Sequence, residues 1–279
     1  MPDPATSEFV DRHVGPDQAE VDAMLAALGR ASLDELIGAT VPAAILRHAD
    51  LELPPARSEA EALDDLRAMA AANTPLRPMI GMGYHDTITP PVILRNVLEN
   101  PAWYTAYTPY QPEIAQGRLE ALVNFQTAIV DLTGMEIANA SLLDEGTAAA
   151  EAVTLCHSVS TVHDGNLLLV DADTHPQTIG VIRTRAEPHD VQVLVAGVPE
   201  LLARAAAPAE GERPFAILLS YPGSSGAVRP LRADIEAAHA AGLLAIVATD
   251  PLAAVLLESP GDQGADVVVA GRACDDAIF

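Results

Sequence analysis

The sequence predicts an α/β protein in which a mostly parallel sheet follows a helical N-terminal segment. From residue 166 onward, short apolar runs alternate with helical patterns. The runs are continuously apolar, which is typical of strands that are covered by helices on both faces. Residues 1–77 instead carry short helical patterns that prolines interrupt. We therefore expect a helical segment over 1–77 and an α/β domain over 78–279.

Capping signals place the helices of the first part. Residues 17–28 have apolar side chains at helical spacing and are followed by Gly29, a residue type favoured just beyond a helix C-terminus. Two further helices are predicted by Ser and Glu residues at the spacing of a capping box. These pairs are Ser32 with Glu35, and Ser58 with Glu61 ahead of a helix that ends near Ala72.

The run from Gly81 to Gln126 holds most of the aromatic residues of a chain that is only 4% aromatic. It is also rich in proline, which a plain structural helix avoids. The elements expected in and after this run are a helix capped by Thr89 and ending near Glu99, an ordered loop over 100–112, a helix over 113–132 stopped by Gly134, and a helix over 147–158.

The α/β part follows in regular alternation. Strands are predicted over 166–173, 190–195, 215–221, 243–250 and 265–271, with helices over 175–186, 199–207 and 231–241. Ligands of such sheets bind beyond the carboxyl ends of the strands. The residues expected at those ends are Asp171, Asp173, Tyr221, Pro222, Gly223 and Asp250.

Composition excludes several classes of partner. The net charge of −24 argues against nucleic acid and against an anionic membrane, since both attract clustered basic side chains. No apolar run reaches membrane-spanning length, and the N-terminus has no secretory h-region. Two cysteines do not make a disulfide framework, so a cytoplasmic location is expected. The scattered histidines and cysteines predict no metal site.

Several long motifs resemble one known family. The motifs FVDRHVGPDQAEVDAMLAALG, TVPAAI, the Gly81 to Gln126 run, SLLDEGTAAAEA, VDADTHPQT, RTRAEP, YPGSSGAVRPL and VATDPLA are similar to the N-terminal half of glycine decarboxylase, the P-protein of the glycine cleavage system. The resemblance implies the fold of type I enzymes that use pyridoxal phosphate (PLP). It also implies release of CO2 from glycine and transfer of the aminomethyl group to the lipoyl arm of the H-protein, with the other glycine cleavage components as partners.

The resemblance breaks off near Val269. There the family continues with a motif like GSAQRFGVP, whereas this chain reads AGRACDDAIF over 270–279. Family members have two related halves, and the second half carries the PLP lysine. All 15 basic residues here are arginine, so this chain alone cannot form a Schiff base between a lysine and PLP. The resemblance thus implies a truncated or frameshifted fragment whose PLP is carried by the missing half or subunit.

Two residues are candidates for contacting PLP. Asp250 ends a buried strand, where a carboxylate could face the pyridinium nitrogen; the alternative, which we favour, is a cap for the next helix. His175 follows Asp171 to Thr174 and could stack on a ring or relay a proton. A structural role at the start of a helix is an equal alternative for His175.

Five residues are candidates for substrate or interface contacts. Thr147 follows Asp144 and Glu145 in a turn whose N–H groups could bind phosphate, although the two carboxylates favour an ordinary helix cap. Tyrosines on a proline-flanked loop suggest a rigid interface with polar tips, with core packing as the alternative. These loop residues are Tyr104, Tyr107, Tyr110 and Gln111.

Two functions from different classes follow. The first is a catalytically incomplete part of the glycine-decarboxylating enzyme. The second is a non-catalytic partner or regulatory subunit that docks on a PLP-bearing chain. We favour the first, because the final predicted strand has no covering helix after it.

Overall fold

A computed structural model gives the structure of residues 13, 15–47, 49, 51–84, 88–104, 108–140 and 142–271. The chain divides into two compact units, residues 1–77 and 78–279.

The first unit is helical. Its helices are α2 (Gln18–Ala27), α3 (Leu33–Thr40) and α4 (Glu59–Ala71). The predicted capping box at Ser58 is confirmed, since both reciprocal hydrogen bonds with Glu61 are present. At α3 the box is only half formed. Glu35 N donates to Ser32 Oγ at 3.1 Å, but the Glu35 carboxylate accepts from Ala31 N at 2.8 Å rather than from Ser32 N.

The second unit begins with short helices whose starts differ from the prediction. Helix α5 (Pro91–Ile93) continues as a π-helix over Leu94–Leu98. Pro90 is the N-cap and no side chain caps the helix, so the prediction that Thr89 caps it is wrong. The physical reason is that Pro91 occupies the first helical position, where its missing N–H costs nothing, which leaves Thr89 outside the cap.

The predicted loop over 100–112 contains a helix. Helix α6 (Pro101–Tyr104) forms there, and Asn100 Oδ1 accepts from Ala102 N at 3.0 Å. An asparagine cap followed by proline favours a helical turn, and this signal outweighed the proline and aromatic content of the segment. Helix α7 (Gln116–Thr133) starts three residues later than predicted and ends at Gly134 with φ of 70°, as expected.

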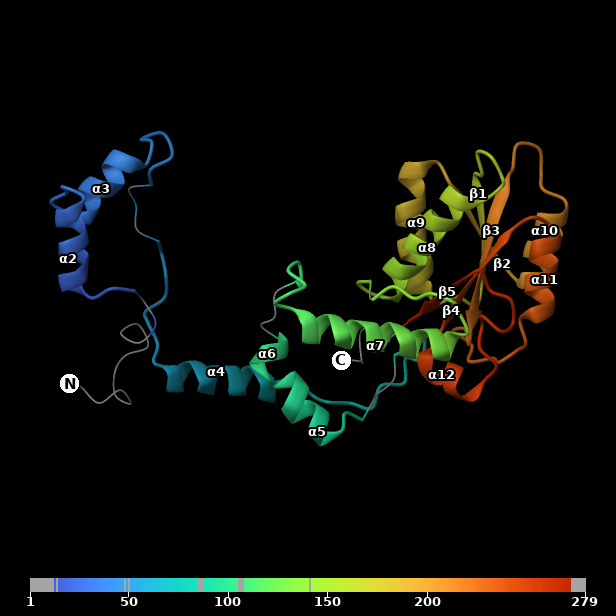
Figure 1. The fold of residues 1–279 in the computed structure, drawn as a ribbon, viewed down its shortest axis with the longest axis horizontal. Helices are drawn as coiled ribbons and strands as arrows, with labels where there is room; N and C mark the ends of the chain where they lie inside the picture. Colours follow the sequence, from blue (N-terminus) through green and yellow to red (C-terminus); the bar gives the residue numbers. More distant parts are fainter. Residues whose placement is uncertain are drawn as a thin grey trace. The chain divides into compact units, whose positions relative to one another are not determined.

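Five parallel strands form one sheet with the order β2-β1-β3-β4-β5 (Figure 1). All four neighbouring pairs are parallel, which confirms the predicted sheet type. The strands are β1 (Leu167–Asp171), β2 (Gln192–Ala196), β3 (Pro214–Tyr221), β4 (Leu244–Thr249) and β5 (Val267–Ala270).

Helices cover both faces of the sheet, as the continuous apolar strands require. Helices α8 (Glu145–Val159) and α9 (Pro176–Ala186) pack on one face. Helices α10 (Val198–Ala206) and α11 (Arg232–Ala240) pack on the other (Figure 1). A 3-10 turn, Glu187–His189, follows α9, and helix α12 (Pro251–Leu256) follows β4.

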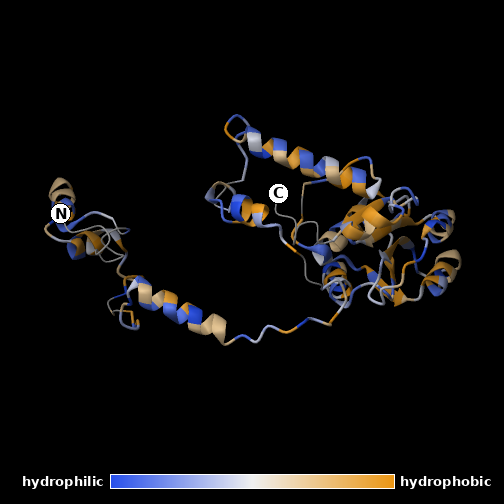
Figure 2. Cartoon of the chain, turned by 90° about the horizontal axis from the view of Figure 1, so that it is seen from below, coloured by the Kyte–Doolittle hydropathy of each residue, from blue (hydrophilic) through white to orange (hydrophobic). Residues whose placement is uncertain are grey.

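The core of the second unit lies along the central strands. All eight residues of β3 are buried, and Leu168 and Leu169 of β1 have no exposed surface. Each fully buried leucine contributes about 1.5–3 kcal/mol through removal of apolar surface from water. In Figure 2 the strands are mainly hydrophobic, and the helices on either side of them carry both hydrophobic and hydrophilic residues. The sheet is therefore a firm support for the loops at its ends.

Among the residues that the structure describes, no helix combines the length and the apolar character that crossing a membrane requires.

Candidate functional site at the carboxyl edge of the sheet

The parallel strands bring a set of polar residues to one edge of the sheet. Asp171 ends β1, Tyr221 ends β3 and Thr249 ends β4. The register pairs Tyr221 with Thr249, and β3 extends two residues beyond the level of Asp171. Thr249 Oγ1 donates to the Tyr221 backbone oxygen at 2.6 Å, which joins the ends of β3 and β4. This edge is where α/β sheets bind ligands, and it is the candidate functional site.

Asp171 is the most buried charged residue of this edge. Its side chain is only 7% exposed, and Arg229 Nη2 lies 3.1 Å from its Oδ2. Asp173 N donates to Asp171 Oδ1 at 3.0 Å. The guanidinium and the backbone N–H together compensate the charge of the buried carboxylate, as a buried ion requires.

Asp173 fixes the loop that follows β3. Its carboxylate accepts from Ser225 N at 2.8 Å and from Ser225 Oγ at 2.7 Å, and its backbone oxygen accepts from Ser224 N at 2.7 Å. The peptide bond between Tyr221 and Pro222 is cis. A Cβ atom at Gly223 would overlap the carboxylate and backbone oxygen of Asp173. The close approach of the two loops therefore requires glycine at this position.

His175 lies beside this loop, at the N-cap position of α9. Its Nδ1 is 2.9 Å from Ser224 Oγ, and the ring is half-buried. Nearby, Ser220 Oγ donates to Thr174 Oγ1 at 3.2 Å. The structure thus places His175 at the carboxyl edge with a hydroxyl partner that fixes the orientation of its ring.

Tyr84 also reaches this edge, although the sequence analysis did not select it. Its hydroxyl is hydrogen-bonded to Gln177 in the first turn of α9, two residues after His175. The backbone around Tyr84 forms an isolated bridge with Gly81. The available signal was the GMGY sequence at the start of the aromatic run. Ser224 was not selected either, although it directly follows Gly223 in the YPGSSGAVRPL motif.

Asp250 serves as the cap of α12. Its Oδ1 accepts from Leu252 N at 2.8 Å, and Asp250 occupies the N-cap position. This is the structural role that the sequence analysis favoured over contact with a pyridinium nitrogen.

The turn before Thr147 is likewise a helix cap. Thr147 N donates to Asp144 Oδ1 at 2.7 Å at the start of α8. This backbone hydrogen bond, with the hydroxyl of the same threonine, holds the pKa of Asp144 below its usual value of 3.8. The carboxylate already stabilises the positive end of the helix, so a phosphate would have to compete with it. Glu145 Oε1 accepts from Thr178 Oγ1 at 3.0 Å and links α8 to α9.

The candidate interface residues lie away from the core. Tyr104 is 66% exposed and Tyr110 is 75% exposed. Gln111 is also exposed. Tyr107 lies outside the described residues. The interface role of these exposed residues stays a prediction.

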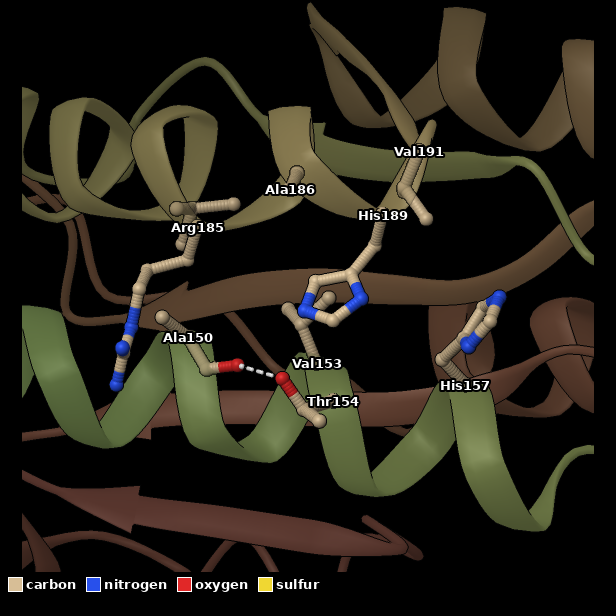
Figure 3. Close-up of a pocket in the computed structure, with 9 residues that line it drawn as sticks. Ala150, Val153, Thr154, His157, Arg185, Ala186, His189 and Val191 are labelled. Atoms are coloured by element: carbon tan, nitrogen blue, oxygen red, sulfur yellow. Dashed lines mark hydrogen bonds between the residues drawn. The ribbon is translucent and has the colours of Figure 1, made fainter.

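A small cavity lies between α8 and the end of α9, lined in part by His157, Arg185 and His189 (Figure 3). Its volume is about 30 Å³, which is the space of a single water molecule. Arg185 forms an ion pair with Glu151 at 2.7 Å, and Thr154 Oγ1 donates to Ala150 O. The cavity is too small for a cofactor, and His175, Asp173 and Ser224 do not line it.

The residues of this chain do not fit PLP as a resident cofactor. Covalent attachment needs a lysine, and the sequence has none. Asp250, the candidate for the pyridinium nitrogen, already caps a helix. Asp144 occupies the helix start that was considered for the phosphate. What the edge offers is a set of hydroxyl, imidazole and carboxylate groups that are held in place by one another.

The parallel sheet with helices on both faces defines an α/β protein, and its match to a solved glycine decarboxylase structure, described below, gives the PLP-dependent transferase fold. Comparison with known proteins identifies the family within that class. The profile described as "Glycine cleavage system P-protein" matches residues 11–274. The chain belongs to this family, and the match extends past Val269, where the motif resemblance was expected to end.

Individual relatives agree with this assignment. Glycine dehydrogenase (decarboxylating) of Gluconobacter oxydans is 56% identical over 264 residues, which cover 95% of this chain and 27% of the relative. The same enzyme of Stutzerimonas stutzeri is 54% identical over 264 residues, with 95% and 27% covered. A crystal structure of glycine decarboxylase (P-protein) in inhibitor-bound form matches with a TM-score of 0.80 and 35% identity, over 93% of this chain and 58% of that one. The chain spans about a quarter of the length of these curated relatives.

Proposed function

We propose that this chain is part of a glycine decarboxylase and acts only together with a lysine-bearing part of the enzyme. The observation that carries the proposal is a family match over residues 11–274 in a sequence that contains no lysine. In the complete enzyme, PLP held by the lysine-bearing part would supply the electron sink that decarboxylation of glycine needs. The aminomethyl group then passes to the lipoyl arm of the H-protein.

In this proposal the lysine-bearing part holds PLP, and this chain supplies a supporting surface. Tyr104, Tyr107, Tyr110, Gln111 and Thr147 contact the partner part or the substrate path. His175, held by Ser224, lies toward the cofactor, and Asp250 keeps its role as a helix cap. The lipoylated H-protein and the other glycine cleavage components are the partners, and the cytoplasm is the location.

The test compares the chain alone with the chain plus a lysine-bearing part. The latter is the portion of the Gluconobacter oxydans relative outside the matched residues, produced together with this chain. We measure exchange of labelled CO2 into glycine in the presence of PLP and lipoylated H-protein. We expect no exchange with this chain alone and exchange when both parts are present.

Two results would contradict the proposal. Exchange catalysed by the purified chain alone would remove the argument from the missing lysine. A pyridoxyl group on an internal residue of this chain, found by peptide mapping after borohydride reduction, would do the same. If the two parts associate but no exchange occurs, the non-catalytic partner subunit becomes the better account.

A further inference from the structure

The turn just before β1 holds the one Asp-Gly pair of the sequence, Asp164–Gly165. The pair lies between the end of α8 and Leu167, where β1 begins. Aspartate followed by glycine is the aspartyl sequence most prone to isomerisation. The reason is that glycine, without a side chain, leaves its backbone nitrogen open to attack the preceding carboxyl group.

The fold favours each member of this pair. Asp164 has φ of 54°, in the left-handed region that aspartate and asparagine tolerate better than other residues with a side chain. Gly165 is buried, and a Cβ atom there would lie 2.8 Å from the Phe215 Cβ. A bulkier residue, which would slow the isomerisation, therefore does not fit after Asp164. The packing at the start of β1 thus keeps a reactive pair in place.

The two groups that would react make no other bonds. Within the part of the chain that the structure describes, neither the Asp164 carboxylate nor the Gly165 N–H has a hydrogen bond or an ion pair. The contacts of the pair are made by its backbone oxygens. Arg213 Nε donates to Asp164 O at 2.6 Å, and His157 Nε2 donates to Gly165 O at 2.9 Å. Asp164 is also exposed, so water can reach it.

Arg213 holds the peptide group between the two residues. For a ring to close, rotation about the Cα–C bond of Asp164 must bring Gly165 N beside the carboxyl carbon. The same rotation turns Asp164 O away from Arg213 Nε. The φ of Asp164 is already positive, as it is at the first central residue of a type II′ turn, the turn that an aspartyl cyclic imide favours. The hydrogen bond from Arg213 therefore opposes ring closure.

We propose that Asp164–Gly165 is a site of spontaneous aspartate isomerisation that Arg213 restrains. Gly165 N forms a bond to the Asp164 carboxyl carbon, and the amide proton leaves as water with the hydroxyl of the protonated carboxyl group. Water then breaks the bond between Gly165 N and the Asp164 backbone carbon. The main chain now runs through the side-chain carbon, and a free α-carboxyl group remains. Nothing is oxidised or reduced, and the product has the mass of the starting chain.

The product adds one methylene to the main chain at the start of the sheet. Asn166 follows directly and joins this turn to the segment before β3. Its Oδ1 accepts from Arg213 N at 2.8 Å, and its Nδ2 donates to Gly211 O at 2.9 Å. The extra carbon would shift these bonds, so the isomerised chain should unfold at a lower temperature. The free α-carboxyl group would be a substrate for carboxyl methyltransferases that use S-adenosylmethionine.

The experiment keeps the purified chain in neutral buffer for several weeks and then maps its peptides. Isoaspartate is identified by electron-transfer fragmentation, and by methyl transfer from labelled S-adenosylmethionine with an isoaspartyl methyltransferase. We expect isoaspartate to accumulate at Asp164, together with an imide that is lighter by one water and that hydroxylamine cleaves. Asp190 is the internal control, because its φ is 55° but Val191 follows it. Asp190 should remain unchanged.

Two arginine variants test the restraint. Arg213→Met removes the hydrogen bond to Asp164 O from an exposed side chain, so the chain should still fold. The isomerisation rate should rise by about fivefold, the factor to which the loss of one net hydrogen bond corresponds. The matched control is Arg232→Met, which removes a bond of the same kind, from Arg232 Nη2 to Asp262 O at 2.7 Å. This control should leave the rate at Asp164 unchanged.

Three results would overturn the inference. The first is absence of isoaspartate at Asp164 in the folded chain, which would show that the fold blocks the reaction. The second is equal accumulation at Asp190, and the third is an equal rate in Arg213→Met and Arg232→Met. The measurement on the unmodified chain needs no variant. If Arg213→Met does not fold, Arg213→Gln removes the same guanidinium and takes its place.

Discussion

Arg229 and Asp171 form an ion pair that joins the loop after β3 to the end of β1, with Arg229 Nη2 3.1 Å from Asp171 Oδ2. Arg229 also pairs with Asp234 of α11. Asp171 is 7% exposed at its side chain, whereas that of Arg229 is 36% exposed. The buried carboxylate thus depends on a guanidinium that reaches it from solvent. This pair holds the edge on which Asp173, Ser225 and His175 are arranged.

Replacing Arg229 with methionine should destabilise the second unit by about 1–3 kcal/mol, because Asp171 would keep a buried charge without its cation. Urea unfolding followed by circular dichroism measures the change. The matched control is Arg185→Met, which removes an ion pair with Glu151 whose side chains are 53% and 46% exposed. An exposed pair should cost below about 1 kcal/mol. Equal losses in the two variants would mean that burial of Asp171 has no energetic consequence.

Gly223 and Gly180 should respond in opposite directions to alanine. At Gly223 the added Cβ would overlap Asp173, so the bonds from Ser225 must lengthen or break. A loss of about 1–3 kcal/mol is expected from the overpacking. At Gly180, inside α9, nothing lies within 4 Å of the new Cβ, and alanine should stabilise the helix by about 0.5–1 kcal/mol. Thermal unfolding of both variants checks this contrast, and a stabilised Gly223→Ala would contradict the described loop packing.

The sheet could be predicted from sequence because its signals are local and strong. Continuous apolar strands such as 215–221 and a capping residue such as Asp250 each indicate one element without reference to the rest of the chain. The carboxyl-edge site could be predicted only in part. Asp173 and His175 were placed correctly at the strand ends, but their partners Ser224 and Ser225 come from 49 and 52 residues away along the chain. No local sequence pattern predicts hydrogen bonds between residues so far apart along the chain.

The helix starts in the aromatic run could not be predicted from local capping signals alone. Thr89 and Asn100 are both good capping residues, but only Asn100 stands directly before a helix and accepts a hydrogen bond from its first turn. The choice depended on which proline took the first helical position, which a spacing rule does not decide. Tyr84 was overlooked because its partner, Gln177, is 93 residues away.

Asp144 should make the stability of the second unit depend on pH in the acid range. Its pKa lies below 3.8 because Thr147 N donates to the carboxylate. The charged Asp144 carboxylate therefore stabilises the fold at pH values above its pKa in the unfolded chain. This contribution to the free energy of unfolding is lost as the pH falls through the lower pKa in the folded chain. Asp144→Ala should cost about 0.5–2 kcal/mol at neutral pH. This difference from the unmodified chain should shrink below about pH 4.

Asp144→Asn is the matched control for that experiment. Asparagine caps helices about as well as aspartate but does not titrate. Its stability relative to Asp144→Ala should therefore stay constant from neutral to acid pH in urea unfolding. A constant difference for the unmodified aspartate as well would show that its carboxylate does not retain the Thr147 bond in solution.

The Cys156 thiol should be unreactive in the folded protein, and it should lower the stability of the fold at alkaline pH. The side chain is fully buried in α8, and burial raises the pKa of its thiol from 9.0 to about 12. The thiolate is the reactive form, so Ellman's reagent should react with Cys156 only as the unit unfolds. The test is made in a Cys274→Ser background, which leaves one thiol to follow. The reaction rate should then rise with urea in parallel with the unfolded fraction.

The sign of the pH effect follows from the same burial. The unfolded chain loses its thiol proton above about pH 9, whereas the folded chain keeps it until about pH 12. The buried protonated thiol therefore makes its full contribution to stability below the pKa of the thiol in the unfolded chain. As the pH rises from that value toward the pKa in the folded chain, the free energy of unfolding falls by more than about 1 kcal/mol per pH unit. Comparison with Cys156→Ala at each pH removes the contribution of other groups. Rapid reaction of Cys156 in the native protein at pH 8, or a pH-independent difference from the alanine variant, would contradict the buried position of this thiol.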